Sequence, residues 1–112
     1  MVQRLEKTFV ILCRNQFYIS NHYIEHTPMK LLHTSDWHLG HRLHEQSQFE
    51  EQSLFLAWLH EYIIDNEIEI LLVSGDIFDN GTPSSQSLKL YYDFLVQLTK
   101  TNCKHIVITG GN

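Results

Sequence analysis

The chain has 112 residues, of which 43% are hydrophobic and 12% aromatic, and its formal net charge is −5. This length leaves room for one small domain, and the composition is typical of an ordinary soluble globular protein. From Met29 onward, eleven acidic residues stand against five basic ones. This balance excludes a domain that grips nucleic acid through clustered Lys and Arg alone.

The two cysteines, Cys13 and Cys103, lie far apart and form no CxxC pair. This usage is typical of reduced thiols in a cytosolic protein, although one disulfide between them stays open. No apolar run is long enough to cross a bilayer, and residues 9–13 are too short for a signal-peptide core. We therefore expect a cytoplasmic protein that has no membrane partner.

Residues 1–28 mix aromatic, charged and polar side chains without sustained periodicity, and they end at Pro28. We predict that this segment is a leader or a mis-started, poorly ordered extension, and that residues 29–112 form the domain. The alternative is a short helix or strand that packs on the domain.

From Met29 the hydrophobic pattern becomes regular. Apolar, β-branched runs predict strands, and apolar residues at helical spacing predict helices. A Thr82 N-cap followed by Pro83 predicts the start of the second helix. The elements expected in chain order are strand 30–34, helix 49–66, strand 68–73, helix 82–101 and strand 104–109. This β-α-β-α-β order predicts an α/β fold with a parallel sheet.

Polar side chains follow each predicted strand directly. Asp36 and His38 follow the first, Asp76 and Asp79 the second, and Asn112 the third. Functional groups gather at the carboxyl ends of parallel strands, so we expect several of these side chains to converge. Carboxylates, an imidazole and an amide oxygen form a mixed ligand set that suits Mn²⁺, Fe²⁺, Zn²⁺ or Co²⁺.

Local spacing supports a metal site. Asp36 and His38 are two residues apart, and in extended backbone such residues project to the same side. Gly75 and Gly111 would let the backbone approach the site without a Cβ in the way.

These motifs carry a family resemblance. Asp-x-His, Gly-Asp-x-x-Asp and Gly-Asn, in this order, resemble the first three motifs of the calcineurin-like metallophosphoesterases. The longer strings at residues 32–40 (LHTSDWHLG) and 75–84 (GDIFDNGTPS) are similar to those of the SbcD-type nuclease subunits of bacterial SbcCD complexes. The resemblance covers residues 29–112. It implies the front half of a four-layer α/β/β/α domain that is truncated here.

The resemblance also implies the role of each ligand. Asp36 and His38 would bind a first ion, Asp76 would bridge both ions and Asn112 would bind the second, with two divalent ions, expected to be Mn²⁺, in all. In the family a catalytic His directly follows the position of Asn112, and three further His ligands come later. Those residues are absent from this sequence, so we expect the 112 residues alone to be inactive.

Other polar residues near the motifs have less specific roles. Asp79 is expected to brace its loop through a hydrogen bond rather than bind metal, and His33 to be a packed or hydrogen-bonded core residue. His41 and His44 would either approach a substrate phosphate or lie in a solvated loop. Trp37 would either stack on a base or pack beside the metal pocket.

By resemblance, the parent protein would be a metal-dependent double-strand DNA exonuclease and single-strand endonuclease in DNA end processing, replication, recombination and repair. It would form a homodimer and act on DNA ends with an SbcC-type ATPase. One alternative is another binuclear metallophosphoesterase, acting on phosphoproteins, nucleotides or small phosphodiesters. Another is a non-catalytic packing or dimerisation module.

Overall fold

The computed structural model describes residues 9–13, 17–19, 22–24 and 29–110 of the chain. Its main sheet has four strands in the order β1-β4-β7-β8. These strands are β1 (Phe9–Cys13), β4 (Met29–Ser35), β7 (Ile70–Ser74) and β8 (His105–Ile108). β4, β7 and β8 run parallel, as the sequence predicts.

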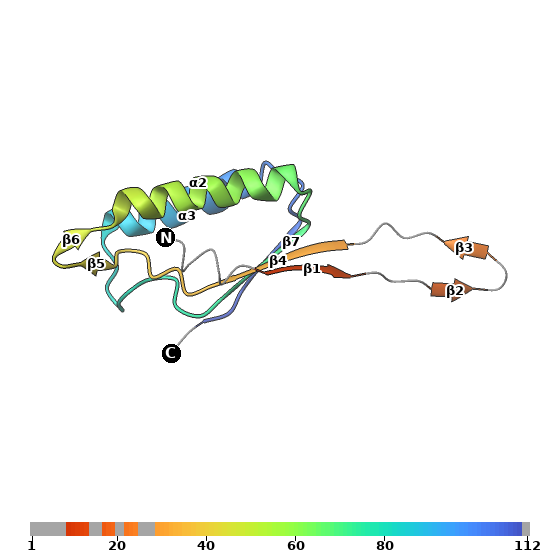
Figure 1. Cartoon of the computed structure of the whole chain (residues 1–112), viewed down its shortest axis with the longest axis horizontal. Coiled ribbons are helices and arrows are strands. Elements are labelled where there is room, and N and C mark those ends of the chain that lie inside the picture. The colour runs from red at the N-terminus through yellow and green to blue at the C-terminus, as the bar shows by residue number, and fades with distance from the viewer. Residues whose placement is uncertain (1–8, 14–16, 20–21, 25–28, 111–112) are drawn as a thin grey trace.

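Two helices connect the parallel strands. Helix α2 (Phe49–Asp65) joins β4 to β7, and α3 (Ser85–Leu98) joins β7 to β8. Both lie side by side over the same face of the sheet (Figure 1). The predicted β-α-β-α-β order and the α/β fold class are therefore confirmed.

The core lies between this sheet face and the helices. Alternate residues of the central strands, including Leu32 and Leu71, turn toward the helices and are fully buried. Each such leucine contributes about 1.5–3 kcal/mol relative to an exposed one. The helices supply the opposing buried residues Phe55, Leu56, Leu59, Ile63, Phe94 and Leu98.

Trp37 belongs to this core. It is 1% exposed, and its ring meets Phe55 and Phe94 edge-on, with centroids 6.4 and 5.5 Å away. Its indole N–H donates to the hydroxyl of Thr34 at 3.0 Å. The ring is therefore packed between strand and helices, and the alternative of stacking on a base is wrong.

Strand β1 adds to the sheet from within the segment 1–28. It pairs antiparallel with β4, from Phe9 opposite His33 to Cys13 opposite Met29. Such a pairing corresponds to the alternative stated for residues 1–28, a short strand that packs on the domain. Of the expected leader, only residues 9–13, 17–19 and 22–24 are described, and the others lie outside the described residues. Strands β2 (Phe17–Ile19) and β3 (His22–Ile24) pair with each other and extend away from the helices (Figure 1).

Helix α3 begins later than predicted. Its N-cap is Ser84, whose extended backbone lets Oγ accept the Ser87 N–H at 3.1 Å. The Thr82 N–H instead donates to the Asn80 side-chain oxygen at 3.1 Å. The Thr82 N-cap prediction is wrong because this local Asn turn captures the Thr82 backbone before the helix can start.

A small hairpin interrupts the loop between β4 and α2. It consists of β5 (Arg42–Leu43) and β6 (Gln46–Ser47). The two turn residues between them, His44 and Glu45, both have positive φ, at 49° and 64°. Such a turn matches the twist of paired strands and closes the hairpin tightly.

Candidate metal centre

The loops that follow β4 and β7 stay bound to each other beyond the strand ends. The N–H of Asp36 donates to the Ser74 carbonyl at 3.0 Å, and the N–H of His38 donates to the Asp76 carbonyl at 3.1 Å. The Leu39 N–H then donates to the Ile77 carbonyl at 2.7 Å. This backbone zipper places the expected ligand positions of both loops side by side.

The same backbone hydrogen bonds also determine the backbone conformation of Asp36 and His38. Asp36 and His38 have φ values of 53° and 48°, in the left-handed region. The expectation of extended backbone between them is therefore wrong. Left-handed backbone costs about 1–2 kcal/mol for a residue with a side chain, and the backbone bonds to β7 and its loop hold both residues in it.

Gly75 makes room for the Asp36 carboxylate. A Cβ on residue 75 would lie 2.1 Å from Asp36 Oδ1, and the φ of Gly75 is +80°. The same oxygen accepts the Asp76 N–H at 3.4 Å. The predicted close approach at Gly75 is confirmed, and it presses the first carboxylate against the backbone that carries Asp76.

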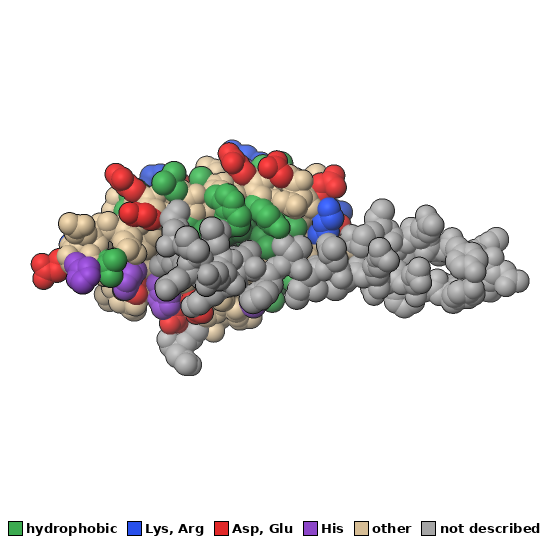
Figure 2. All heavy atoms as spheres, in the orientation of Figure 1, with side chains coloured by type: hydrophobic (Ala, Val, Ile, Leu, Met, Phe, Trp, Pro, Cys, Tyr) green, Lys and Arg blue, Asp and Glu red, His purple; other side chains and the backbone are tan. Residues whose placement is uncertain are grey.

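Asp79 bridges the two loops. Its Oδ1 accepts from His41 Nδ1 at 3.2 Å and lies 3.5 Å from His38 Nδ1. Its own N–H donates to the Leu39 carbonyl at 3.0 Å. His33, by contrast, bonds Ser74 Oγ at 2.7 Å within the sheet, as expected for a hydrogen-bonded histidine. Figure 2 shows histidine side chains gathered toward the end of the molecule that carries β5 and β6.

Gln52 is a residue that the sequence motifs did not reveal. It is 3% exposed, and its side chain accepts the Gly40 N–H at 2.9 Å and donates to the His38 carbonyl at 3.2 Å. It thereby braces the loop that carries the first motif. The sequence feature that could have indicated this role is a polar residue on an apolar stripe. Gln52 stands four residues before Leu56, on the side of α2 that faces the core.

The ligand set is brought together only in part. Asp36, His38 and Asp76 lie on adjacent loops, but Asn112 and Gly111 lie outside the described residues. The Thr109 N–H donates to the Val73 carbonyl at 2.9 Å, so the end of β8 lies beside β7. Within residues 29–110 and the described parts before them, no three His, Cys, Asp or Glu side chains form a group that could hold an ion. The donors fit a divalent cation by chemistry, with carboxylates and imidazole on neighbouring loops.

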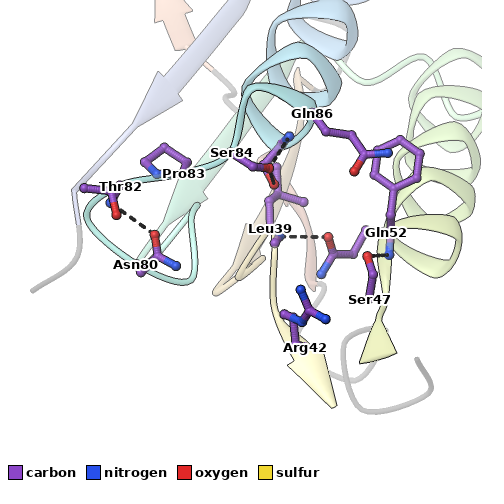
Figure 3. A pocket seen from close by; sticks show the side chains of 12 residues that line it. Leu39, Arg42, Ser47, Gln52, Asn80, Thr82, Pro83, Ser84 and Gln86 are labelled. Atoms are coloured by element: carbon purple, nitrogen blue, oxygen red, sulfur yellow. Dashed lines mark hydrogen bonds between the residues drawn. The ribbon is translucent and has the colours of Figure 1, made fainter. Parts of the chain in front are cut away.

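A pocket of about 370 Å³ adjoins these loops, between the starts of α2 and α3 (Figure 3). It carries the guanidinium of Arg42 and no carboxylate. Its lining residues are Leu39, Gly40, Arg42, Ser47, Phe49, Gln52, Asn80, Thr82, Pro83, Ser84, Gln86 and Ser87. Such a lining offers a cation and hydrogen-bond donors to a bound anion.

The calcineurin-like phosphoesterase family matches residues 29–112. The chain therefore belongs to this family, as its motifs and its strand-end loops indicate. Neither helix in the described part is long and apolar enough to span a membrane.

Comparison with individual relatives shows which members of the family the chain resembles. The chain is 43% identical over 84 residues to the SbcD subunit of the SbcCD nuclease of Escherichia coli (strain K12), covering 75% of this chain and 21% of that protein. It is 40% identical over 85 residues to the SbcD subunit of Rhodobacter capsulatus, again 75% and 21%. It is 36% identical over 84 residues to that of Bacillus subtilis (strain 168), at 75% and 22%. The chain thus spans about a fifth of the length of these relatives and is SbcD-like over that span.

Proposed function

We propose that this chain supplies metal ligands to an SbcD-type nuclease that hydrolyses phosphodiester bonds at DNA ends. The observation that carries the proposal is the backbone zipper, which holds Asp36 and His38 against the loop of Asp76. Family membership and the similarity to SbcD subunits support the same chemistry.

The proposed centre holds two divalent ions, with Mn²⁺ as the expected metal. Asp36 and His38 would hold one ion, Asn112 would hold the other, and the Asp76 carboxylate would contribute to both. When bound, such a pair would supply Lewis-acid polarisation of a phosphodiester and activation of water at neutral pH. The chain itself contributes the negative charge of its carboxylates, the close approach at Gly75 and the zipper that keeps the loops in register.

The pocket beside these loops supports a phosphate-containing substrate. Arg42 is its cation, although its guanidinium also donates to the Glu45 carbonyl. Hydroxyl and amide side chains share the rest of the lining with the apolar residues Leu39, Phe49 and Pro83, and no carboxylate is among the lining residues. Arginine and neutral hydrogen-bond donors are among the groups that contact DNA phosphates. Phosphate contacts of this kind carry no sequence information.

The proposed assembly is a homodimer of the parent protein with an ATPase partner of the SbcC type. It would act in the cytoplasm, in DNA recombination and repair. Figure 2 shows Asp and Glu side chains along the helical side of the molecule, so a partner must supply much of the positive charge that DNA requires. Apolar residues on the outward sides of the helices support a protein contact there; they are Leu54, Trp58, Tyr92 and Val96.

Two measurements test the proposed function. Mn²⁺ titrated into the 112-residue chain should bind saturably, and Asp76→Ala should abolish the binding. The matched control is Asp93→Ala, because Asp93 is an exposed aspartate on α3 that pairs only with Lys89 among the ion pairs described. Binding that survives Asp76→Ala would contradict the proposed site and favour a packing or dimerisation module.

The second measurement concerns substrate. The full-length gene product with Mn²⁺ is expected to degrade linear duplex DNA and to leave cyclic nucleotides and phosphopeptides intact. The reverse preference would indicate another member of the phosphoesterase family. The 112 residues alone are expected to turn over none of these substrates, since their described part assembles no complete ligand group.

A further inference from the structure

One oxygen of Asp79 lies close to two imidazole rings. Asp79 Oδ1 is 3.2 Å from Nδ1 of His41 and 3.5 Å from Nδ1 of His38. We propose that Asp79 is a positioning residue that fixes the proton of both rings on Nδ1 and so turns both Nε2 lone pairs outward. The proposal rests on the metal-binding role given to His38 above.

The chemistry of the groups dictates the proton positions. An ionised carboxylate has only acceptors, and a neutral imidazole has one N–H and one bare nitrogen. A ring whose Nδ1 faces the carboxylate gains attraction only when that nitrogen carries the hydrogen. The bare nitrogen is then Nε2, the form in which histidine binds a metal ion.

Asp79 is held firmly enough to do this. Its N–H is bonded to the Leu39 carbonyl at 3.0 Å, and the Leu39 N–H is bonded to the Ile77 carbonyl at 2.7 Å. The backbone of Asp79 is therefore bonded to the same loop that carries His38. All three side chains are only about a third exposed or slightly more, at 32% for Asp79, 37% for His38 and 42% for His41. Water thus reaches all three side chains.

The two contacts are unequal, which gives a second consequence. His41 has the shorter contact to Oδ1 and His38 the longer one, so the two rings share a single acceptor. Removing the His41 ring leaves the carboxylate to His38 alone. His38 should then keep its Nδ1–H form, and its metal affinity should stay the same or rise.

The experiment reads the ring protons directly. Long-range ¹H–¹⁵N NMR spectra of the 112-residue chain, recorded without metal at about pH 8, distinguish the two tautomers of a neutral imidazole. We expect the Nδ1–H form for His38 and His41 in the unaltered chain and in Asp79→Asn, whose amide oxygen can still accept. In Asp79→Ala both rings should shift toward Nε2–H. His33, which is bonded to Ser74, serves as the internal reference and should not change.

Metal affinity gives an independent readout. Mn²⁺ binding, followed by the loss of the free-ion electron paramagnetic resonance signal, should weaken about 10–100-fold in Asp79→Ala. His41→Ala should bind at least as tightly as the unaltered chain. Unchanged core methyl signals in both variants would show that folding is intact. Where Asp79→Ala does not fold, the tautomer of His38 in the unaltered chain still tests the inference.

The outcomes separate this inference from the proposed function. If His38→Ala abolishes Mn²⁺ binding while Asp79→Ala alters neither tautomer nor affinity, Asp79 has no positioning role and the metal site stands. If His38→Ala leaves binding unchanged, the proposed metal site fails, whatever the tautomers are. An Nε2–H form of His38 in the unaltered chain would overturn the inference at once.

Discussion

The carboxylate of Asp36 occupies the space that a side chain on residue 75 would need. A Cβ there would lie 2.1 Å from Asp36 Oδ1, far inside van der Waals contact, and the backbone at Gly75 has φ of +80°. Two separate constraints therefore require glycine at this position. One is the left-handed backbone, and the other is the Asp36 carboxylate that packs against it.

Gly75→Ala is expected to destabilise the chain by at least about 1–2 kcal/mol, the cost of left-handed backbone for alanine. The displaced Asp36 should also lose its place against the Asp76 N–H, so Mn²⁺ binding should fall. Urea unfolding and metal titration measure the two effects. Gly81→Ala is the matched control, because a Cβ at Gly81 meets no atom within 4 Å. An equal loss in both variants would contradict the clash.

Ser84→Ala should cost about 1 kcal/mol of unfolding free energy, since it removes the oxygen that caps the first turn of α3. Thr82→Ala should cost less, because its backbone N–H, and not its side chain, makes the described bond to Asn80. Chemical denaturation of the two variants decides which residue caps the helix. A larger loss for Thr82→Ala would restore the start of the helix predicted from sequence.

Trp37→Ala should destabilise the chain by about 3–5 kcal/mol, the usual range for deleting a buried aromatic side chain. The variant also leaves the Thr34 hydroxyl without its indole donor. Trp58→Ala is the comparison, because Trp58 is 38% exposed although it stacks on Phe55. Thermal unfolding followed by circular dichroism should rank the two. Similar losses would show that Trp37 is not the central residue of the core.

Stability should fall at alkaline pH because of Cys103. Burial raises the pKa of this thiol above its ordinary 9.0, although backbone groups of Leu71 and His105 act in the opposite direction. As pH rises through 9.0, the unfolded thiol releases its proton while the folded one keeps it. The unfolded state then binds fewer protons, so the free energy of unfolding declines above that pH and is unaffected below it.

Urea unfolding at a series of pH values checks this dependence. A Cys13→Ser background leaves Cys103 as the single thiol, and Cys103→Ala in that background should remove the decline near pH 9. Tyr91, whose pKa burial and the neighbouring Tyr92 also raise, acts only above its ordinary 10.0. A decline that persists in Cys103→Ala below that pH would assign the effect to another group.

The elements that the sequence predicts well are those with a repeating apolar pattern. Helix α2 begins at Phe49 as predicted, because its core stripe recurs through Leu56, Leu59 and Ile63. The central strands were equally predictable, being short and almost wholly apolar. The start of α3 was not, since two hydroxyl residues flank Pro83 and only the Asn80 turn decides between them.

The candidate site shows the same division. Which residues follow the strands was evident from the sequence, whereas the left-handed backbone of Asp36 and His38 was not. That conformation depends on carbonyl groups of β7 and its loop, about 40 positions away in the chain. The role of Gln52 could not be predicted for a related reason. A polar residue on a buried helix stripe can be assigned a role only when its hydrogen-bond partners, here Gly40 and His38, are known.

The amide hydrogens that join the two loops are expected to exchange with solvent among the slowest in the described part of the chain. Those of Asp36 and His38 are held by carbonyls of the Ser74–Asp76 stretch, and β4 and β7 are the two inner strands of the sheet. Exchange with solvent deuterium at these sites requires the inner strands to part, so protection there should approach that of global unfolding. A cation would consequently meet ligand backbones that are already ordered, and its affinity would depend on the number and charge of its donors.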